Sequence, residues 1–200
     1  VGTYDSENRI YHGSRFDDTV YTKTGGGKGD DVYTYGGNDY IYTWGRSDNV
    51  YAGDGNDTIV AHSSSLVLDG GAGNDKISIH RASSINTVKV FGGQGDDTIT
   101  SNDCPAYIYT NSETGGKDST AVDVINVYSS DATIYAQSKS NLITCSGNYK
   151  NNYYAYIDQY TYIKDYAGDD SLTLTNTEGT TDGAKENLHV LFNVSSNSSY

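Results

Sequence analysis

The sequence predicts an all-β protein whose chain coils as a parallel β-solenoid with nine-residue half-turns. Apolar residues recur every nine positions, turns rich in glycine and aspartate precede several of them, and no stretch shows the 3.6-residue period of an amphipathic helix. A nine-residue half-turn holds one short strand and one tight turn, so two half-turns complete one turn of the coil. We therefore expect stacked turns around a narrow apolar core.

The apolar markers of this rhythm come first. Ile41, Val50, Ile59, Leu68 and Ile77 are spaced nine residues apart without interruption, a regularity that chance makes improbable. Each marker should point inward and its sequence neighbours outward, because side chains alternate along a strand. Before and after this run the spacing is interrupted, and the markers there are Val20, Tyr33, Val90, Ile99, Ile108, Ile125, Ile134, Ile143, Ile163, Leu172 and Val190.

Three slips in the rhythm predict longer loops at about 80–89, 110–121 and 146–160. We expect one solenoid domain over residues 1–200, with the best repeats in 13–101 and degenerate turns followed by a C-terminal cap in 102–200. The tyrosine-dense stretch 146–164 is interpreted as an outgrowth that caps the coil or as a self-association surface. Because the chain opens on VGTYDS without Met, we interpret it as a fragment of a longer protein.

Composition excludes several classes of partner. The chain has 13 Lys and Arg against 26 Asp and Glu, for a formal net charge of -13. This charge disfavours binding to nucleic acids or anionic membranes, and no apolar run approaches the length of a membrane span. A compact chain this acidic repels itself unless cations neutralise the acidic groups. Hydrophobic residues are only 35% of the chain and 20 residues are Tyr, so the core should be thin.

The turns combine glycines with carboxylates at a fixed offset from the apolar marker. The four clearest are GGKGDDVYT at 26–34, AGDGNDTIV at 52–60, GGAGNDKIS at 70–78 and GGQGDDTIT at 92–100. Glycine supplies the backbone angles of a tight turn, but Asn or Ser would turn the chain as well as Asp does. Asp39, Asp57 and Asp75 are eighteen residues apart, so they should form a column of carboxylates about 5 Å apart that repel one another.

A hard divalent cation between turns would remove this repulsion, and calcium fits best. Calcium accepts six to eight oxygens in flexible geometry, including the backbone carbonyls that a glycine turn leaves open. Magnesium prefers to keep its waters, and zinc prefers His or Cys, which these turns lack. The alternative is that these are ordinary Asn-Asp-Gly turns without a metal.

Three of the four turns match the nonapeptide G-G-x-G-x-D-x-U-x in full, and AGDGNDTIV lacks only the first glycine. The chain thus resembles the RTX, or haemolysin-type, repeats of secreted bacterial toxins, proteases, epimerases and adhesins. The resemblance covers about residues 13–101 and implies a right-handed parallel β-roll that binds several calcium ions. Carried over position by position, it implies the following calcium-binding residues: Asp31, Asp39, Asp48, Asp57, Asp75, Asp97, Asn56, Asn74, Asp96, Gly27, Gly53, Gly71 and Gly93.

Two features depart from the family pattern. HSSSLVLD at 62–69 keeps the marker Leu68 but lacks the glycines and the Asp, so a calcium should be missing between the turns carrying Asp48 and Leu68. The chain also has two cysteines, Cys104 and Cys145. Spacing alone does not decide whether these two pair, and a disulfide would indicate an oxidising compartment.

The outward positions are rich in tyrosine and threonine. We expect a binding face that includes Tyr40, Tyr42, Tyr51, Tyr107, Tyr109 and Tyr135. Tyrosine offers a rigid ring with a hydrogen-bonding tip, which suits protein or glycan partners. The alternative, given equal weight, is that Tyr and Thr only form ladders along the strands. A third reading is ice binding, which the irregular order of these side chains argues against.

No motif for catalysis is present: there is no GxSxG, HExxH or phosphate loop, and the four histidines lack a nearby nucleophile. His62 and His80 are eighteen residues apart and should stack. We therefore expect a non-enzymatic, extracellular calcium-binding module that adheres to a glycan or a cell-surface protein. The alternative is a module for calcium-triggered folding and type I secretion, attached to a larger toxin or enzyme.

Overall fold

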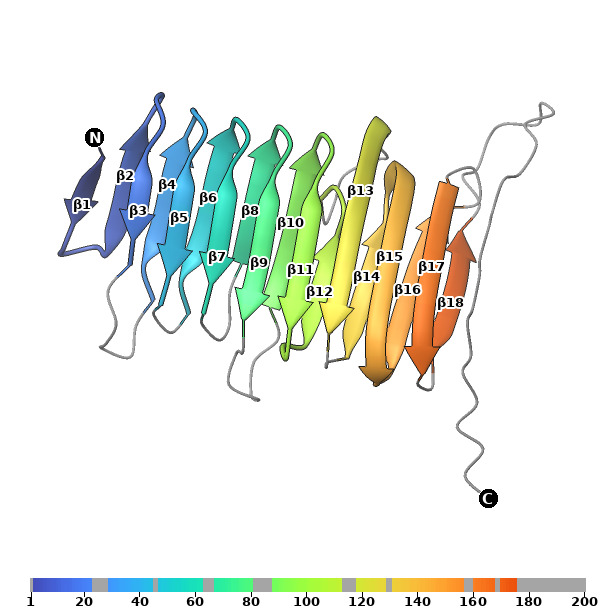
Figure 1. Ribbon diagram of the computed structural model, residues 1–200. Helices are drawn as coiled ribbons and strands as arrows, with labels where there is room; N and C mark the ends of the chain where they lie inside the picture. The colour runs from blue at the N-terminus through green and yellow to red at the C-terminus, as the bar shows by residue number, and fades with distance from the viewer. Residues whose placement is uncertain are drawn as a thin grey trace, which may run out of the picture.

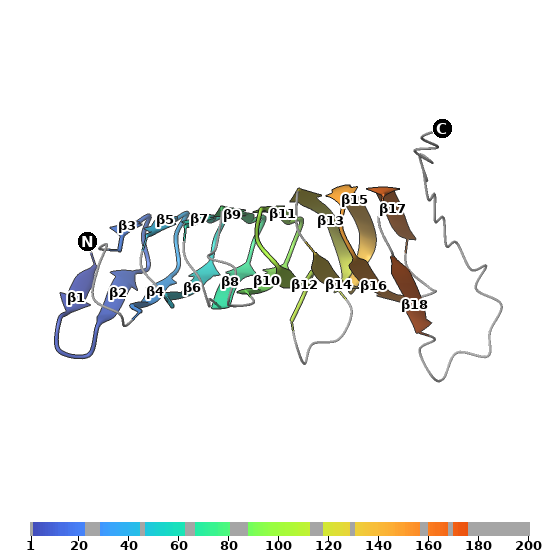
Figure 2. The same cartoon turned by 90° about the horizontal axis from the view of Figure 1, so that it is seen from below.

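The computed structural model describes residues 2–22, 29–44, 47–62, 67–80, 88–112, 118–128, 131–156, 160–167 and 170–175. All regular structure in these ranges is β-strand, as predicted, and the strands form a β-solenoid of stacked turns (Figure 1). Apart from the antiparallel β1–β2 pair, the strand pairs are parallel. Seen from below, the two sheets form two facing layers (Figure 2).

The solenoid alternates between a ten-stranded and an eight-stranded sheet. In order across the first sheet, the strands are β1 (Thr3–Asp5), β2 (Ile10–Ser14), β4 (Asp31–Tyr35), β6 (Asn49–Asp54), β8 (Val67–Ala72), β10 (Val88–Gln94), β12 (Ala106–Tyr109), β14 (Ala132–Ala136), β16 (Asn151–Tyr156) and β18 (Ser171–Thr175). In chain order, those of the second are β3 (Thr19–Tyr21), β5 (Tyr40–Thr43), β7 (Thr58–Ala61), β9 (Lys76–His80), β11 (Thr98–Asn102), β13 (Asp118–Tyr128), β15 (Ser138–Asn148) and β17 (Tyr160–Ala167).

The predicted markers form the core. Ile41, Ile59 and Ile77 lie opposite one another on successive strands of the eight-stranded sheet and are fully buried. The other confirmed markers are Val20, Val50, Leu68, Val90, Ile99, Ile108, Ile125, Ile134, Ile143 and Ile163. Leu172 is only partly buried against the core, and Val190 lies outside the described residues. Many strands bury a second residue two positions from the marker, such as Ile79 beside Ile77 and Val88 beside Val90, and these complete the core between the two sheets.

The prediction that Tyr33 is a core marker is wrong. Val32 is fully buried and lies opposite Val50, whereas Tyr33 lies on the outer face opposite Tyr51. The doublet Asp30–Asp31 allowed the repeat to be placed one residue too late. The same one-residue error affects the aspartates, because Asp30, not Asp31, takes the position that Asp57 takes in its own turn.

The slips in the rhythm mark inserted residues that leave the stacking intact. Equivalent aspartates are 18 residues apart between β7 and β9, 22 apart between β9 and β11, and 26 apart between β11 and β13. The third predicted loop is wrong, because β16 occupies much of 146–160 and places Tyr153 in the core opposite Ile134. Residues 81–87 and 113–117, within the other two predicted loops, lie outside the described residues.

Candidate metal-binding column

Six aspartates stack along one side of the solenoid, where the chain passes from the ten-stranded to the eight-stranded sheet. We call them the aspartate column: Asp18, Asp39, Asp57, Asp75, Asp97 and Asp123. The first five directly precede strands β3, β5, β7, β9 and β11, and Asp123 lies within β13. The turns before them need glycine, since Gly55 and Gly73 adopt φ values of 134° and 132° that L side chains rarely adopt.

One oxygen of each carboxylate holds the turns together. The backbone N–H of Asp39 donates to Oδ1 of Asp57 at 2.7 Å, and the N–H of Asp57 donates to Oδ1 of Asp75 at 2.8 Å. The same bond links Asp18 to Asp39, Asp75 to Asp97 and Asp97 to Asp123, at 2.7–2.9 Å. The predicted column of Asp39, Asp57 and Asp75 is therefore confirmed, and it extends beyond them in both directions.

The second carboxylate oxygen has no such partner. Oδ2 of Asp39, Asp57, Asp75 and Asp97 is buried and receives no hydrogen bond. These side chains are at most 2% exposed, so water does not hydrate the charge. Leaving a buried acceptor unsatisfied costs about 1–3 kcal/mol, and more when the group is charged.

Burial raises the pKa of these carboxyl groups. Together with a smaller effect of neighbouring carboxylates, it raises the pKa of Asp57 to about 6, that of Asp75 to about 7 and that of Asp97 to about 8. The pKa of Asp39 is raised for the same reasons. At neutral pH the metal-free column therefore favours protonation of Asp75 and Asp97, and a bound cation could take the place of these protons.

Glycines bring a carbonyl oxygen close to the unsatisfied carboxylate oxygen. A Cβ atom at Gly70 would lie 2.4 Å from Oδ2 of Asp75 and 2.5 Å from the carbonyl oxygen of Gly92. In the next turn, a Cβ atom at Gly92 would lie 2.5 Å from Oδ2 of Asp97 and 2.7 Å from the carbonyl oxygen of Thr110. The turns of Asp75 and Asp97 therefore each present one carboxylate and one carbonyl oxygen beside a glycine, whereas Ala52 and Thr34 take this position in the turns of Asp57 and Asp39.

The outer predicted ligands form a second ladder that runs in the opposite direction. The backbone N–H of Asn74 donates to Oδ1 of Asn56 at 2.7 Å, and that of Asp96 donates to Oδ1 of Asn74 at 2.9 Å. These side chains therefore have a structural partner, one turn further along the chain. The Asn-Asp pair in each turn is explained by two hydrogen-bonded ladders, of which only the aspartate column leaves buried oxygens unsatisfied.

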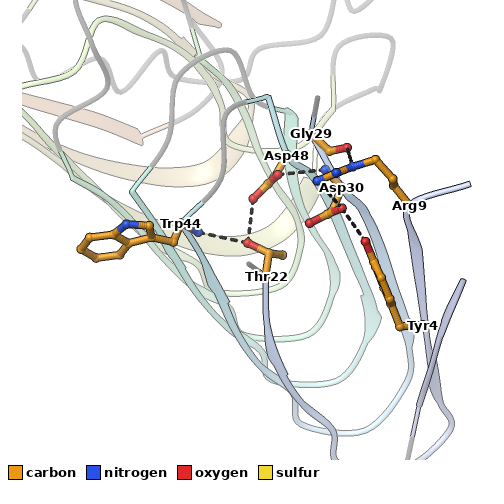
Figure 3. A network of polar contacts seen from close by, with 7 residues as sticks. All are labelled: Tyr4, Arg9, Thr22, Gly29, Asp30, Trp44 and Asp48. Atoms are coloured by element: carbon orange, nitrogen blue, oxygen red, sulfur yellow. Dashed lines mark hydrogen bonds and ion pairs between the residues drawn. The ribbon is translucent and has the colours of Figure 1, made fainter. Parts of the chain in front are cut away.

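On the opposite side of the solenoid, other groups of the protein pair with the equivalent aspartates Asp30 and Asp48 (Figure 3). The backbone N–H of Asp30 donates to Oδ1 of Asp48, and the Thr22 hydroxyl donates to Oδ2 of Asp48 at 2.8 Å. Arg9 pairs with Oδ1 of Asp30 at 2.9 Å, and the Tyr4 hydroxyl donates to the same oxygen. A guanidinium and two hydroxyls thus provide here what the aspartate column lacks.

The remaining predicted ligands are dispersed. Asp31 begins β4, apart from both columns, and accepts a hydrogen bond from the Asn49 side chain. Gly53, Gly71 and Gly93 lie on the outer face of the ten-stranded sheet, with positive φ. Gly27 lies outside the described residues, as do residues 63–66, where the missing calcium was expected.

Sequence reasoning missed two members of the column, Asp18 and Asp123. Both precede a core marker by two residues, in Asp18-Thr-Val20 and Asp123-Val-Ile125, as Asp57 precedes Ile59. This Asp-x-apolar unit was the available signal. Neither aspartate lies in a turn that matches the nonapeptide G-G-x-G-x-D-x-U-x, and for this reason the motif did not predict them.

No family model, curated protein or solved structure matches this chain. The described residues contain no helix long and apolar enough to cross a membrane. Within the same ranges, no group of three or more His, Cys, Asp or Glu side chains gathers as a metal site. The donor set of the column is therefore one carboxylate oxygen per turn together with backbone carbonyls, a set that suits a hard cation and not zinc.

The predicted tyrosine face divides between the two sheets. Tyr51, Tyr109 and Tyr135 lie on the ten-stranded sheet, where Tyr109 stacks on Tyr135 with ring centroids 4.4 Å apart and is only 8% exposed. Tyr107 is more exposed, on the same sheet. These stacked rings stabilise the sheet as a ladder and leave little ring surface for a partner.

Tyr40 and Tyr42 belong to an aromatic cluster on the eight-stranded sheet. Ring contacts of 4.8–6.1 Å connect its members, which are Tyr21, Tyr40, Tyr42, Trp44, His62 and His80. The predicted stack of His62 on His80 is confirmed at 4.8 Å. No disulfide links Cys104 and Cys145, both of which are buried.

Proposed function

We propose that this chain is a calcium-binding β-solenoid module whose fold is stabilised by calcium along the aspartate column. The observation that carries the proposal is the buried, unpartnered Oδ2 of Asp39, Asp57, Asp75 and Asp97. On the opposite side of the coil, an arginine and hydroxyl groups satisfy the equivalent carboxylates. A bound cation would supply the same compensation in the column.

Calcium is the cation that these donors suit best. The column offers carboxylate oxygens and backbone carbonyls in turns that repeat at a fixed spacing, and calcium tolerates such mixed, irregular oxygen shells. Asp75 and Asp97, with the carbonyl oxygens of Gly92 and Thr110, would hold it in the best-formed turns. When bound, calcium supplies positive charge that keeps the carboxylates ionised without repulsion.

Such a module would fold where calcium is plentiful. In the cytosol, where calcium is scarce, repulsion within the acidic chain would leave its fold only weakly stable, and a chain that unfolds readily suits export through a channel. Outside the cell, calcium binding would be linked to folding, because the site forms only in the folded chain. We therefore propose an extracellular location, with type I secretion as the route.

The test is a comparison of folding with and without calcium. Circular dichroism and thermal melts would be recorded in excess EDTA and then in millimolar calcium, with magnesium at equal ionic strength as the matched control. We expect calcium to raise the melting temperature strongly and magnesium to raise it little. A chain that folds and melts identically in EDTA and in calcium would overturn the proposal.

A second candidate function is adhesion through the aromatic cluster on the eight-stranded sheet. Tyr21, Tyr40 and Trp44 are 65%, 38% and 49% exposed, and exposed aromatic groups are common in glycan and protein interfaces. The calcium-loaded module and a Trp44→Ala variant would be compared for binding to immobilised glycans and to cells. Binding that the variant loses would support adhesion, and no binding by either protein would leave the folding module as the function.

A further inference from the structure

An open groove of about 280 Å³ crosses the starts of three neighbouring strands of the ten-stranded sheet, β12, β14 and β16. The residues that directly precede these strands line one side of the groove: Pro105, Asp131 and Lys150. The second residue of each strand lines the other side: Tyr107, Thr133 and Asn152. Residues two apart along a strand share a face, so the groove runs between two rows of side chains on the outer face of the sheet.

Small residues keep this groove open. Ala106 and Ala132 lie opposite each other between the two rows and are 3% exposed, so the floor of the groove is mostly backbone. In the second row Thr133 lies between Tyr107 and Asn152, and two strand spacings, about 9.6 Å, separate those two residues. The space above Thr133 is therefore wide enough for one pyranose ring.

Tyr107 differs from the stacked tyrosines of the neighbouring row. Tyr135 stacks on Tyr109 and on Tyr154, with ring centroids 4.4 and 4.8 Å apart. Tyr107 is 39% exposed, and within the described part of the chain its side chain has no ring contact and no hydrogen bond. Its ring surface and its hydroxyl group are therefore available to a ligand in the groove.

The polar side chains of the groove have unused hydrogen-bonding groups. Oδ1 of Asp131 accepts the backbone N–H of Lys150 at 2.9 Å, and Oδ1 of Asn152 accepts the Ser171 hydroxyl at 2.7 Å. Among the described residues, Oδ2 of Asp131, the amide nitrogen of Asn152 and the ammonium group of Lys150 have no protein partner. The groove thus offers one charged acceptor and several donors beside an exposed ring.

The charges in and around the groove favour a neutral ligand. Asp131 and Lys150 carry opposite charges, so the groove itself is close to neutral. The whole chain has a net charge of -13, which disfavours an anionic ligand. A neutral ligand with several hydroxyl groups fits best, because each hydroxyl both donates and accepts hydrogen bonds.

We propose that this groove binds one neutral pyranose unit of a glycan. The C–H face of the sugar packs against the Tyr107 ring, and its hydroxyl groups bond to Asp131, Lys150 and Asn152. An apolar ligand would take water away from these polar groups without replacing its hydrogen bonds. The groove lies on a different sheet from the aromatic cluster that contains Trp44, and away from the aspartate column, so it can be tested separately from both.

The test is a titration of the folded protein in millimolar calcium, followed by NMR of its backbone amides. The probes are the methyl glycosides of glucose, galactose and mannose, each compared with its uronate. We expect at least one neutral glycoside to bind with a dissociation constant of about 1–10 mM and to shift the amides of β12, β14 and β16. The uronate of that sugar should bind at least about tenfold more weakly. The proposal would be overturned if no neutral glycoside bound, or if the uronate bound as tightly.

Variants locate the site. Tyr107→Ala removes the ring and Asp131→Ala removes the acceptor, and we expect each to weaken binding at least about tenfold with little change in melting temperature. Tyr162→Ala is the matched control and should bind like the parent, because Tyr162 is similarly exposed, at 36%, on the eight-stranded sheet. Binding that Trp44→Ala loses and Tyr107→Ala keeps would overturn this inference and would leave adhesion through the aromatic cluster standing.

Discussion

Replacing Asp75 by asparagine should have opposite effects in the absence and in the presence of calcium. The amide keeps Oδ1 as the acceptor for the backbone N–H of Asp57, so the ladder remains intact. It removes the negative charge of the buried, unpartnered Oδ2. We expect Asp75→Asn to stabilise the metal-free protein and to reduce the stabilisation that calcium provides.

The magnitude follows from the pKa of Asp75. Burial raises this pKa from 3.8 to about 7, so keeping the group ionised at pH 8 costs roughly 4 kcal/mol. The substitution removes this cost but introduces amide N–H donors. A buried donor without a good acceptor costs about 1–3 kcal/mol, so only part of the saving remains. The net gain of about 1–3 kcal/mol corresponds to a rise in melting temperature of about 2–12 °C for a domain of this size.

The assay is a thermal melt at pH 8 in EDTA and in millimolar calcium, followed by circular dichroism. Asp54→Asn is the matched control, because it makes the same chemical change at an exposed position one turn away. The control should melt like the parent protein under both conditions. The reasoning would be refuted if Asp75→Asn melted at a lower temperature than the parent in EDTA. It would also be refuted if calcium raised the melting temperature of the variant as much as that of the parent.

Three further predictions follow from the same structure. First, the raised pKa values of the column mean that the folded chain holds protons more tightly than the unfolded chain does, so the stability they provide is complete below about pH 4 and is lost as the pH rises through 6 to 8. The melting temperature in EDTA should therefore fall between pH 5 and pH 9, and calcium should flatten this dependence; a metal-free profile that is flat or rises would contradict the unsatisfied column. Second, Gly92→Ala should lower both the melting temperature and the calcium affinity measured by calorimetry, because its Cβ would lie 2.5 Å from Oδ2 of Asp97. Unchanged calcium affinity would show that this turn does not bind calcium. Third, Tyr135→Ala should cost about 1–3 kcal/mol in urea unfolding, because Tyr135 stacks on rings at 4.4 and 4.8 Å, whereas the exposed Tyr107→Ala should cost less; equal losses would argue against the ladder.

Much of the fold could be predicted because the repeat is local. Ile41, Ile59 and Ile77 share one environment at one spacing, and a strand that alternates inward and outward can bury them in only one register. Where two registers were nearly equivalent, prediction failed. Val32 and Tyr33 are both good strand formers behind a doublet of aspartates, and only the stacking of Val32 on Val50 decides between them.

Insertions and loop-like composition also misled the prediction. The stretch around Tyr153 has the asparagines and tyrosines of a surface loop, yet it forms β16 and buries that ring. The hydroxyl of Tyr153 donates to the Asp165 carboxylate, a partner from β17 that sequence spacing does not indicate. A large polar residue becomes a core residue when a distant strand satisfies its hydroxyl group.

The sequence by itself determined the solenoid, its apolar core and the aspartate column, because each depends on a repeat that brings equivalent residues together whatever lies between them. The tertiary structure alone decided which carboxylate oxygens are satisfied. Asp48 and Asp75 occupy similar places in similar turns, but Thr22 reaches Oδ2 of Asp48, and Oδ2 of Asp75 has no partner. That difference depends on which side chains approach from neighbouring turns, and it separates a turn whose carboxylate oxygens are all paired from one for which we propose a bound cation.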